Sequence, residues 1–308
     1  MMDITEKVQE WLEKARERFF ELDLRELDES LTPEERVEWD NIYASFRSGS
    51  LMRGRIIGME HMPRPEADHD PEAADSEGTD MPCMIVLPYR VKILIPEPFF
   101  WWPGEERETF VLNSMAGANV DFVIIAVDRP AGCAVASRIM ALSRRRWEAK
   151  EIAHLEEGSI VDCDVLSVGP SRLTLSCYGY DDTLTQIGLS YSYLGDLRNT
   201  YYPGQILHAK VLSFTDERLE VSVKAAAPNP YDGARQRHPP GSVRMASITS
   251  KYAGGVFVRL DDGCTAVCRY ARHFSDDQFH PGDTVKVEIV SYSDDKQWML
   301  AKIKGKIG

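Results

Sequence analysis

Two stretches of sequence with one shared pattern decide the fold: residues 203–224, PGQILHAKVLSFTDERLEVSVK, and residues 281–302, PGDTVKVEIVSYSDDKQWMLAK. Each begins with Pro-Gly and ends on a lysine 20 residues after that glycine. In each, an acidic turn residue follows the glycine by 12 positions, at Asp216 and at Asp294. The flanking runs are rich in β-branched and aromatic residues, so each stretch predicts a strand, a tight turn and a second strand.

A looser copy of this block runs from Gly117 to Arg138 with a turn at 130–132. Further glycines, Gly158 and Gly241, precede the Pro-Gly glycines by 46 and 41 residues, so each repeat is about 65–70 residues long. That length holds roughly five short strands. Five strands favour a small closed barrel over a sandwich, because closure leaves no exposed sheet edge. The expected fold class is therefore mainly β, with tandem barrels.

The charge of the 308-residue chain is unevenly distributed. The net charge is −13, and residues 1–48 contribute −7 while residues 61–82 contribute −6, so the remainder is neutral. Attraction to phosphate depends on local patches rather than on the total. Basic clusters occur at 138–150, 235–251 and 296–306. Each is either a solvated face or a phosphate-binding surface.

The region before the barrels is expected to be helical. Residues 3–29 have helical apolar spacing, and Thr32-Pro33-Glu34-Glu35 predicts the start of a second helix that ends near Gly49. This acidic region either caps the first barrel or docks a protein partner, and the cap is favoured. The full division of the chain is 1–48 helical, 49–143 barrel, 144–155 helical linker, 156–225 barrel, 226–239 Pro-rich linker and 240–308 barrel, with 61–82 as a flexible acidic insertion in the first barrel.

Several function classes are not supported by the sequence. No apolar run is long enough to span a membrane, and no secretory signal is readable, so a cytoplasmic location is expected. The six cysteines are too sparse for a disulfide scaffold. Cys264 and Cys268 with His273 and His280 suggest zinc, but four residues along a strand separate the thiols by about 13 Å. We find no catalytic constellation, metal site or cofactor motif, and expect a protein that is not an enzyme.

The ordered motifs in residues 241–303 resemble the S1 RNA-binding domain of ribosomal protein S1 and of several ribonucleases. The shared features are an opening glycine, Lys-Tyr-Ala-Gly-Gly before Val-Phe-Val, an Asp-Gly hairpin at 262–263, and Pro-Gly-Asp before the last two strands. Residues 157–225 and 49–143 resemble more diverged copies. The resemblance implies five-stranded oligonucleotide-binding (OB) barrels that bind single-stranded RNA.

The third repeat has an outward face suited to nucleic acid. Strand alternation over 255–260 directs Phe257 and Arg259 outward together, and a ring beside a cation provides base stacking and phosphate attraction. The resemblance implies that Tyr252 and Phe257 are ligand-facing aromatics, and it places Arg269, beside Tyr270, where the family often has histidine. The candidate nucleic-acid-binding residues are Lys251, Tyr252, Phe257, Arg259, Arg269, Tyr270 and Arg272 in the third repeat, with Arg90 and Lys92 in the first.

The second repeat is expected to be mainly structural, because it has no aromatic at the Phe257 position and residues 156–225 carry a balance of −5. Two functions stay open from the sequence. The first is an RNA-binding protein whose partners are single-stranded RNA and the ribosome or another RNA–protein complex, with no membrane partner. The second is a scaffold whose barrels have lost RNA binding and whose N-terminal helices dock a protein. They differ in whether the aromatics and the cations share an open groove.

Overall fold

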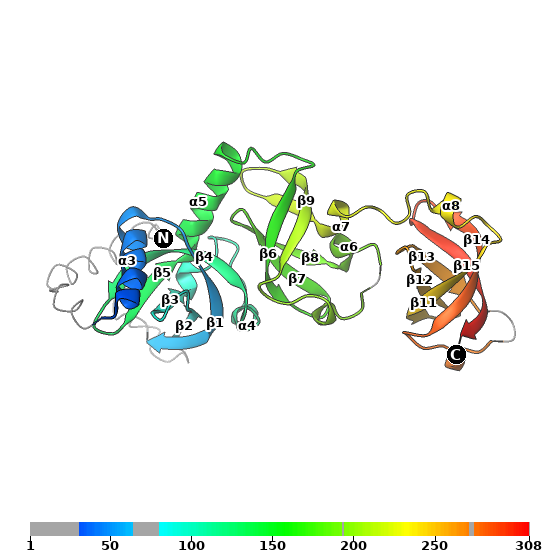
Figure 1. Ribbon diagram of the computed structural model, residues 1–308, viewed down its shortest axis with the longest axis horizontal. Coiled ribbons are helices and arrows are strands. Elements are labelled where there is room, and N and C mark those ends of the chain that lie inside the picture. The colour runs from blue at the N-terminus through cyan, green and yellow to red at the C-terminus, as the bar shows by residue number, and fades with distance from the viewer. Residues whose placement is uncertain (1–30, 64–79, 193, 271–273, 308) are drawn as a thin grey trace, which may run out of the picture.

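The computed structural model describes residues 31–63, 80–192, 194–270 and 274–307. Its strands form three five-stranded units that lie in a row along the long axis (Figure 1). The expected helix over 3–29, most of the acidic insertion (64–79) and Arg272 lie outside the described residues. The chain is mainly β, as the repeat predicted.

The first and third units are closed barrels with the same strand order, β1-β2-β3-β5-β4 and β11-β12-β13-β15-β14. In each, a parallel pair closes the barrel, β3 with β5 and β13 with β15. This closed five-stranded order confirms the predicted OB architecture for both. Their strands are β1 (Met52–Pro63), β2 (Asp80–Val86), β3 (Lys92–Pro96), β4 (Asn119–Asp128), β5 (Cys133–Ser137), and β11 (Val243–Tyr252), β12 (Gly255–Leu260), β13 (Thr265–Arg269), β14 (Thr284–Ser293), β15 (Trp298–Ile307).

The repeat is visible in the backbone hydrogen bonds. An equivalent glycine in each unit adopts a positive φ, between 87° and 96°. Its N–H donates to a carbonyl of the first strand at 2.8 Å. In all three units the first strand has a bulge directly after that carbonyl. The three donor–acceptor pairs are Gly117 to Ile56, Gly204 to Val165, and Gly282 to Ile248.

The second unit is a five-stranded sheet of order β10-β9-β6-β7-β8, and in the described chain β8 and β10 do not pair to close it. The expectation of a closed barrel over 156–225 was wrong in this respect. Strand β10 ends at Ser222, where the chain turns into a short helix, and the Ser222 hydroxyl donates to the carbonyl of Gly188 at 3.1 Å. The elements are β6 (Ile160–Val168), β7 (Arg172–Cys177), β8 (Tyr180–Thr185), β9 (Ile206–Phe214), β10 (Leu219–Ser222), α6 (Gln186–Leu189) and α7 (Val223–Ala226).

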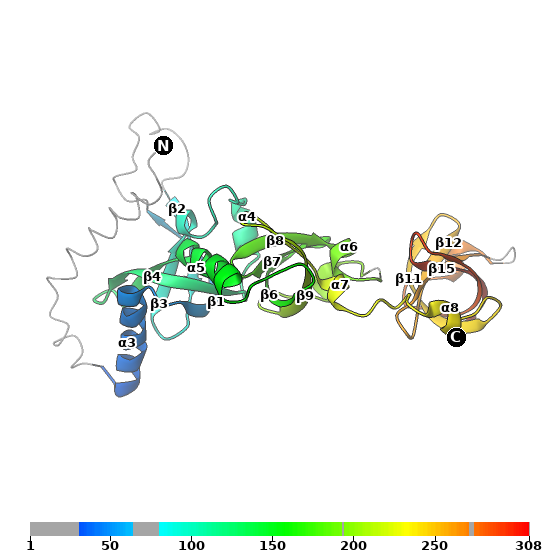
Figure 2. The ribbon, with the colours of Figure 1, turned by 90° about the horizontal axis from the view of Figure 1, so that it is seen from above.

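Helix α3 (Pro33–Ser48) covers one side of the first barrel. Thr32 and Glu35 form the predicted capping box, and Gly49 ends the helix with a φ of 65°. Trp39 and Ile42 are buried in the core of the first unit. The described helix therefore packs as a cap (Figure 2), with the apolar face directed inward.

Strands β1 and β2 extend into the segment that the sequence assigned to a flexible insertion. His61 pairs with Pro82 and Met62 pairs with Met81, so the expected bounds of 61 and 82 were wrong. Met62 and Met81 pack on a small buried cluster that includes Ile85. This packing stabilises the paired ends of β1 and β2. The sequence did not predict these strand ends, because prolines and acidic residues are uncommon inside strands.

Helix α5 (Arg138–Glu151) connects the first two units and begins six residues before the predicted start at 144. Ser137, the last residue of β5, also caps the helix by accepting the Met140 N–H at 3.3 Å. The strand and the helix thus meet with no intervening loop. The sequence therefore lacks the loop residues that usually mark the start of a helix. The remaining short helices are η2 (Glu97–Phe99), α4 (Thr109–Asn113), η3 (Leu197–Asn199), α8 (Ala234–Arg237) and η4 (Asp276–Gln278).

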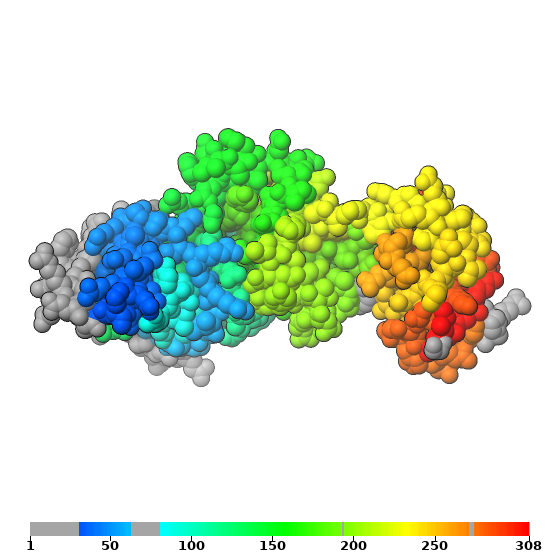
Figure 3. Space-filling view, viewed as in Figure 1, coloured from blue at the N-terminus to red at the C-terminus, as the bar shows by residue number. Residues whose placement is uncertain are grey.

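The Pro-rich linker 226–239 is docked on the third barrel. Ala234 of α8 is buried in that barrel's core, and the Tyr292 hydroxyl donates to the Ala234 carbonyl at 2.9 Å. In the space-filling view the third unit forms a separate lobe (Figure 3). Among the described residues, no helix has the length and apolar character needed to cross a membrane.

Candidate nucleic-acid interface

Three aromatic rings form a continuous cluster on the outside of the third barrel. The centroids of Tyr252 and Phe257 are 5.2 Å apart, and those of Phe257 and Trp298 are 5.8 Å apart. All three side chains are partly exposed. The two predicted aromatics therefore lie together, and their ring partners belong to the same barrel rather than to a neighbouring unit. We name Tyr252, Phe257 and Trp298 the aromatic face.

Strand alternation and a tight hairpin position these rings. On β12, Val256 and Val258 point into the core, so Phe257 points outward. Tyr252 closes the β11–β12 hairpin, where its hydroxyl donates to the Cys268 carbonyl at 3.2 Å. Its ring lies over Gly255, where a Cβ atom would collide with it. Burial raises the pKa of the Tyr252 hydroxyl, and the neighbouring Arg269 opposes this effect in part.

Trp298 was missed by the sequence reasoning, although the signal was present. Met299, Ala301 and Ile303 are buried on β15, so Trp298 belongs to the outward set of that strand. The lysine of the preceding turn, Lys296, lies 5.1 Å from the centroid of its ring. A cation held over an exposed indole adds positive potential at the edge of the aromatic face.

Cations surround the aromatic face. Arg269 ends β13 beside Gly255 and Lys302, and Arg259 is exposed on β12 two residues after Phe257. Within the described residues, none of Arg259, Arg269 and Lys302 forms an ion pair. Glu288 lies opposite Lys302 in the β14–β15 register, but it forms its ion pair with Lys304. The three cations can therefore bind an anionic ligand, although the Glu288 carboxylate partly offsets the charge of Lys302.

Lys251 and Tyr270, by contrast, are held by an internal partner. The Lys251 ammonium contacts the Asp276 carboxylate at 2.8 Å, and the Tyr270 hydroxyl donates to the same carboxylate at 2.7 Å. The Tyr270 ring is also stacked on Phe279. Hydrogen bonds from Lys251 and Tyr270 lower the pKa of Asp276. Both predicted residues thus anchor the η4 segment to the barrel.

The two candidate residues of the first barrel also have internal partners. Arg90 contacts three glutamates of α3, among them Glu34 at 2.9 Å and Glu38 at 3.5 Å. Lys92 pairs with Glu60 on β1. The structure thus brings neither residue to the aromatic face, and Arg90 connects the N-terminal helix to the barrel.

In the second unit, a side chain from the first occupies the position equivalent to the aromatic face. The registers place Thr174 on β7 where Phe257 stands on β12. Arg107, from the loop before α4, donates to the hydroxyl of Thr174 at 3.3 Å and to that of Thr183 at 2.6 Å. Thr174 is buried as a result. In the first unit the equivalent residue is Ile85, which is buried as well.

The basic cluster at 138–150 also has a structural role. Arg138 is almost fully buried and forms a bidentate pair with Asp181 of the second unit. Arg145 pairs with Asp121 at 2.7 Å. Arg146 stacks under Trp102 at 3.9 Å. The sequence left this cluster open as a solvated face or a phosphate-binding surface, and the structure shows neither, because Arg138 and Arg146 bind acceptors of the second unit and Arg145 binds Asp121.

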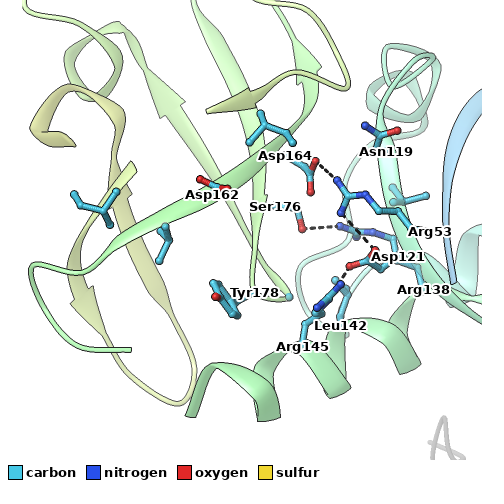
Figure 4. A pocket seen from close by; sticks show the side chains of 15 residues that line it. Arg53, Asn119, Asp121, Arg138, Leu142, Arg145, Asp162, Asp164, Ser176 and Tyr178 are labelled. Carbon is cyan, nitrogen blue, oxygen red and sulfur yellow. Dashed lines mark hydrogen bonds and ion pairs between the residues drawn. The ribbon is translucent and has the colours of Figure 1, made fainter. Parts of the chain in front are cut away.

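A cavity of about 570 Å³ lies between these two units (Figure 4). Every charged side chain lining it has a partner, for example Arg53 with Asp164 and Asp162 with His208. Burial raises the pKa of Asp164 despite that pairing. This cavity offers no unpaired charge to a ligand.

One cluster in the described chain could in principle hold a metal ion: His238, Asp262 and Cys264. However, the Arg237 guanidinium donates to Asp262 at 2.8 Å, and Arg244 donates to the His238 Nδ1 at 3.1 Å. Burial would raise the pKa of Asp262, but hydrogen bonds from His238 and Arg237 hold it well below its ordinary value. Arg237 and Arg244 thus bind the atoms of Asp262 and His238 that would otherwise coordinate a cation. The cluster instead fixes the linker to the Asp-Gly hairpin.

Comparison with known proteins agrees with this architecture. No family model matches the chain. The chain is 23% identical over 201 residues to small ribosomal subunit protein bS1 of Pseudomonas aeruginosa, covering 62% of this chain and 36% of the relative. The S1-type resemblance is thus confirmed. The chain is also 25% identical over 214 residues to 4-hydroxy-3-methylbut-2-enyl diphosphate reductase of Clostridium acetobutylicum, covering 63% of this chain and 33% of that enzyme.

The chain therefore spans about a third of the length of these two relatives. Among solved structures, that of GSP13 from Bacillus subtilis aligns with 21% of this chain and 55% of that chain, at 22% identity and a TM-score of 0.19.

Proposed function

We propose that this protein is not an enzyme and binds single-stranded RNA through the aromatic face of its third barrel. The observation that carries the proposal is the juxtaposition of three outward rings with Arg259, Arg269 and Lys302, cations that have no ion-pair partner in the described structure. The likeness to bS1 supports an RNA ligand. On the same ground, the ribosome or another RNA–protein complex is the proposed setting.

Each group has a distinct role in this proposal. Phe257 and Trp298 supply ring faces on which successive bases stack, an interaction that tolerates any base. Arg269 and Lys302 neutralise phosphates beside the rings, which makes binding dependent on salt. Lys251 and Tyr270 act indirectly, because they hold η4 against the barrel. Arg90 and Lys92 have no part in it, since their charges are paired.

Replacement of single rings tests the proposal. We expect Phe257→Ala and Trp298→Ala each to weaken binding by about 1–3 kcal/mol, the worth of one stacked base. Trp147→Ala is the matched control, because Trp147 is a tryptophan 56% exposed on α5, in another part of the molecule. The measurement is the fluorescence anisotropy of a labelled oligouridine, with oligodeoxythymidine in parallel to compare RNA with DNA. Wild-type affinity in Trp298→Ala, or no binding by the wild type, would overturn the proposal.

A scaffold role is the second candidate for the first two units. The face of the second is filled by Arg107, and the basic residues of α5 bind acids of both units. These contacts favour a structural role for this half of the chain. If the wild type bound no RNA at low salt, the scaffold would be the better account of the whole chain.

A further inference from the structure

A second cleft lies between the second and third units, at the end of the aromatic face. It encloses about 510 Å³ and is bounded by α6, the start of the linker and the β12–β13 hairpin. The Ser192 hydroxyl donates to the Gly263 carbonyl at 3.4 Å across it. Arg259 lines this cleft and also lies on the outward side of β12, two residues beyond Phe257. Two residues of a strand span about 6.6 Å, so the aromatic face leads directly into the cleft.

The second unit contributes a cation and a ring to the cleft. The Lys224 ammonium lies 4.5 Å from the centroid of the Tyr191 ring, and both side chains are partly exposed. Within the described residues Lys224 has no ion-pair partner. Asp261 also lines the cleft, so Lys224 and Arg259 outnumber the carboxylate there by one. A ring beside a cation repeats the chemistry of Trp298 with Lys296.

We infer that this cleft is a second nucleotide-binding subsite, in which Lys224 and Arg259 bind a phosphodiester and Tyr191 stacks a base. The inference rests on the proposed function and extends it, because a strand bound on the aromatic face continues past Arg259 onto the second unit. The second unit then contributes to binding through its α6–α7 edge, even though Arg107 fills its sheet face. The two units together bind a longer segment of RNA than the third barrel binds alone.

Oligonucleotide length separates the two sites experimentally. Titrations use the full chain with oligouridines of about 5 nucleotides, near the smallest site size of one OB barrel, and about 24 nucleotides, beyond the largest of about 16. We expect Lys224→Gln to lower the log–log salt slope for the longer RNA by about 0.7, the contribution of one phosphate contact, and to leave binding of the shorter RNA unchanged. Tyr191→Ala is expected to weaken binding of the longer RNA alone.

Lys210→Gln is the matched control, because it removes the same charge from β9 of the same unit, outside the cleft. The inference is overturned if Lys224→Gln behaves like Lys210→Gln with the longer RNA. It is also overturned if Lys224→Gln weakens both lengths equally, since that result indicates a general field effect. Loss of binding of both lengths in Phe257→Ala, with no effect of Lys224→Gln, rejects the cleft and retains the proposed function.

Discussion

The Arg138–Asp181 pair joins the first unit to the second with both side chains almost removed from solvent, at 1% and 3% exposure. Two hydrogen bonds of 2.8 Å connect the guanidinium to the carboxylate, and a third joins it to the Phe100 carbonyl. A buried charge that loses its partner keeps its desolvation cost without compensation. This pair is therefore critical to the junction, whatever its net contribution relative to an apolar pair.

Asp181→Ala is expected to lower the free energy of unfolding by about 3–5 kcal/mol, because it leaves Arg138 buried and uncompensated. Asp162→Ala is the control: this aspartate is 67% exposed and pairs with His208, so its loss should cost no more than about 1 kcal/mol. Urea denaturation of both variants gives the comparison. Equal effects would show that the Arg138 pair does not hold the junction.

At the scale of elements, helix α5 packs closely against the second unit. Gly179 adopts a φ of 82°, and a Cβ atom there would collide with the Leu142 carbonyl oxygen of the helix. Its own carbonyl accepts from the Arg146 guanidinium at 2.8 Å. The turn between β7 and β8 thus fits directly against the helix backbone.

Gly179→Ala should therefore be more destabilising than Gly195→Ala. Both glycines have a positive φ, so both substitutions carry a backbone strain of about 1 kcal/mol. Only at Gly179 must α5 also move, since a Cβ at Gly195 meets no atom within 4 Å. Thermal unfolding followed by circular dichroism measures the difference. If the two melting temperatures fall equally, the helix does not press on this turn.

Elements with local signals could be predicted from the sequence. The capping box at Thr32 correctly predicted the start of α3, and the repeated glycines correctly predicted turns. Both predictions succeeded because caps and turns depend on neighbouring residues. The start of α5 and the open edge at β10 could not be predicted in this way. Each depends on what packs there in three dimensions. At the site, alternation identified Phe257, whereas the Asp276 partner of Lys251 lies 25 residues away without a sequence signal.

At the scale of the whole molecule, the first two units form one body and the third unit forms another. The contacts within the first body are more extensive than those between the two bodies. The first two units share α5 and the buried Arg138 pair. The third unit follows a linker (Figure 1), and the hydrogen bond from Ser192 to the Gly263 carbonyl connects it to the second. Domains joined by small polar contacts unfold with limited cooperativity.

Differential scanning calorimetry should accordingly resolve two transitions. Oligouridine in excess should raise the midpoint of the third-unit transition more, because a ligand stabilises most the body that holds most of its contacts. Asp181→Ala should lower the midpoint of the other transition. A single transition that both perturbations shift equally would contradict this division.

The contact of Arg107 with Thr174 and Thr183 has a consequence for protein engineering. Installing an aromatic residue at position 174 would not by itself create a new docking surface for a base, because a guanidinium from the adjoining unit already fills the site. Arg107 would have to be replaced in the same variant, and the two units would then lose one of the contacts that align them. Gain of recognition in this half of the chain is thus coupled to loss of rigidity.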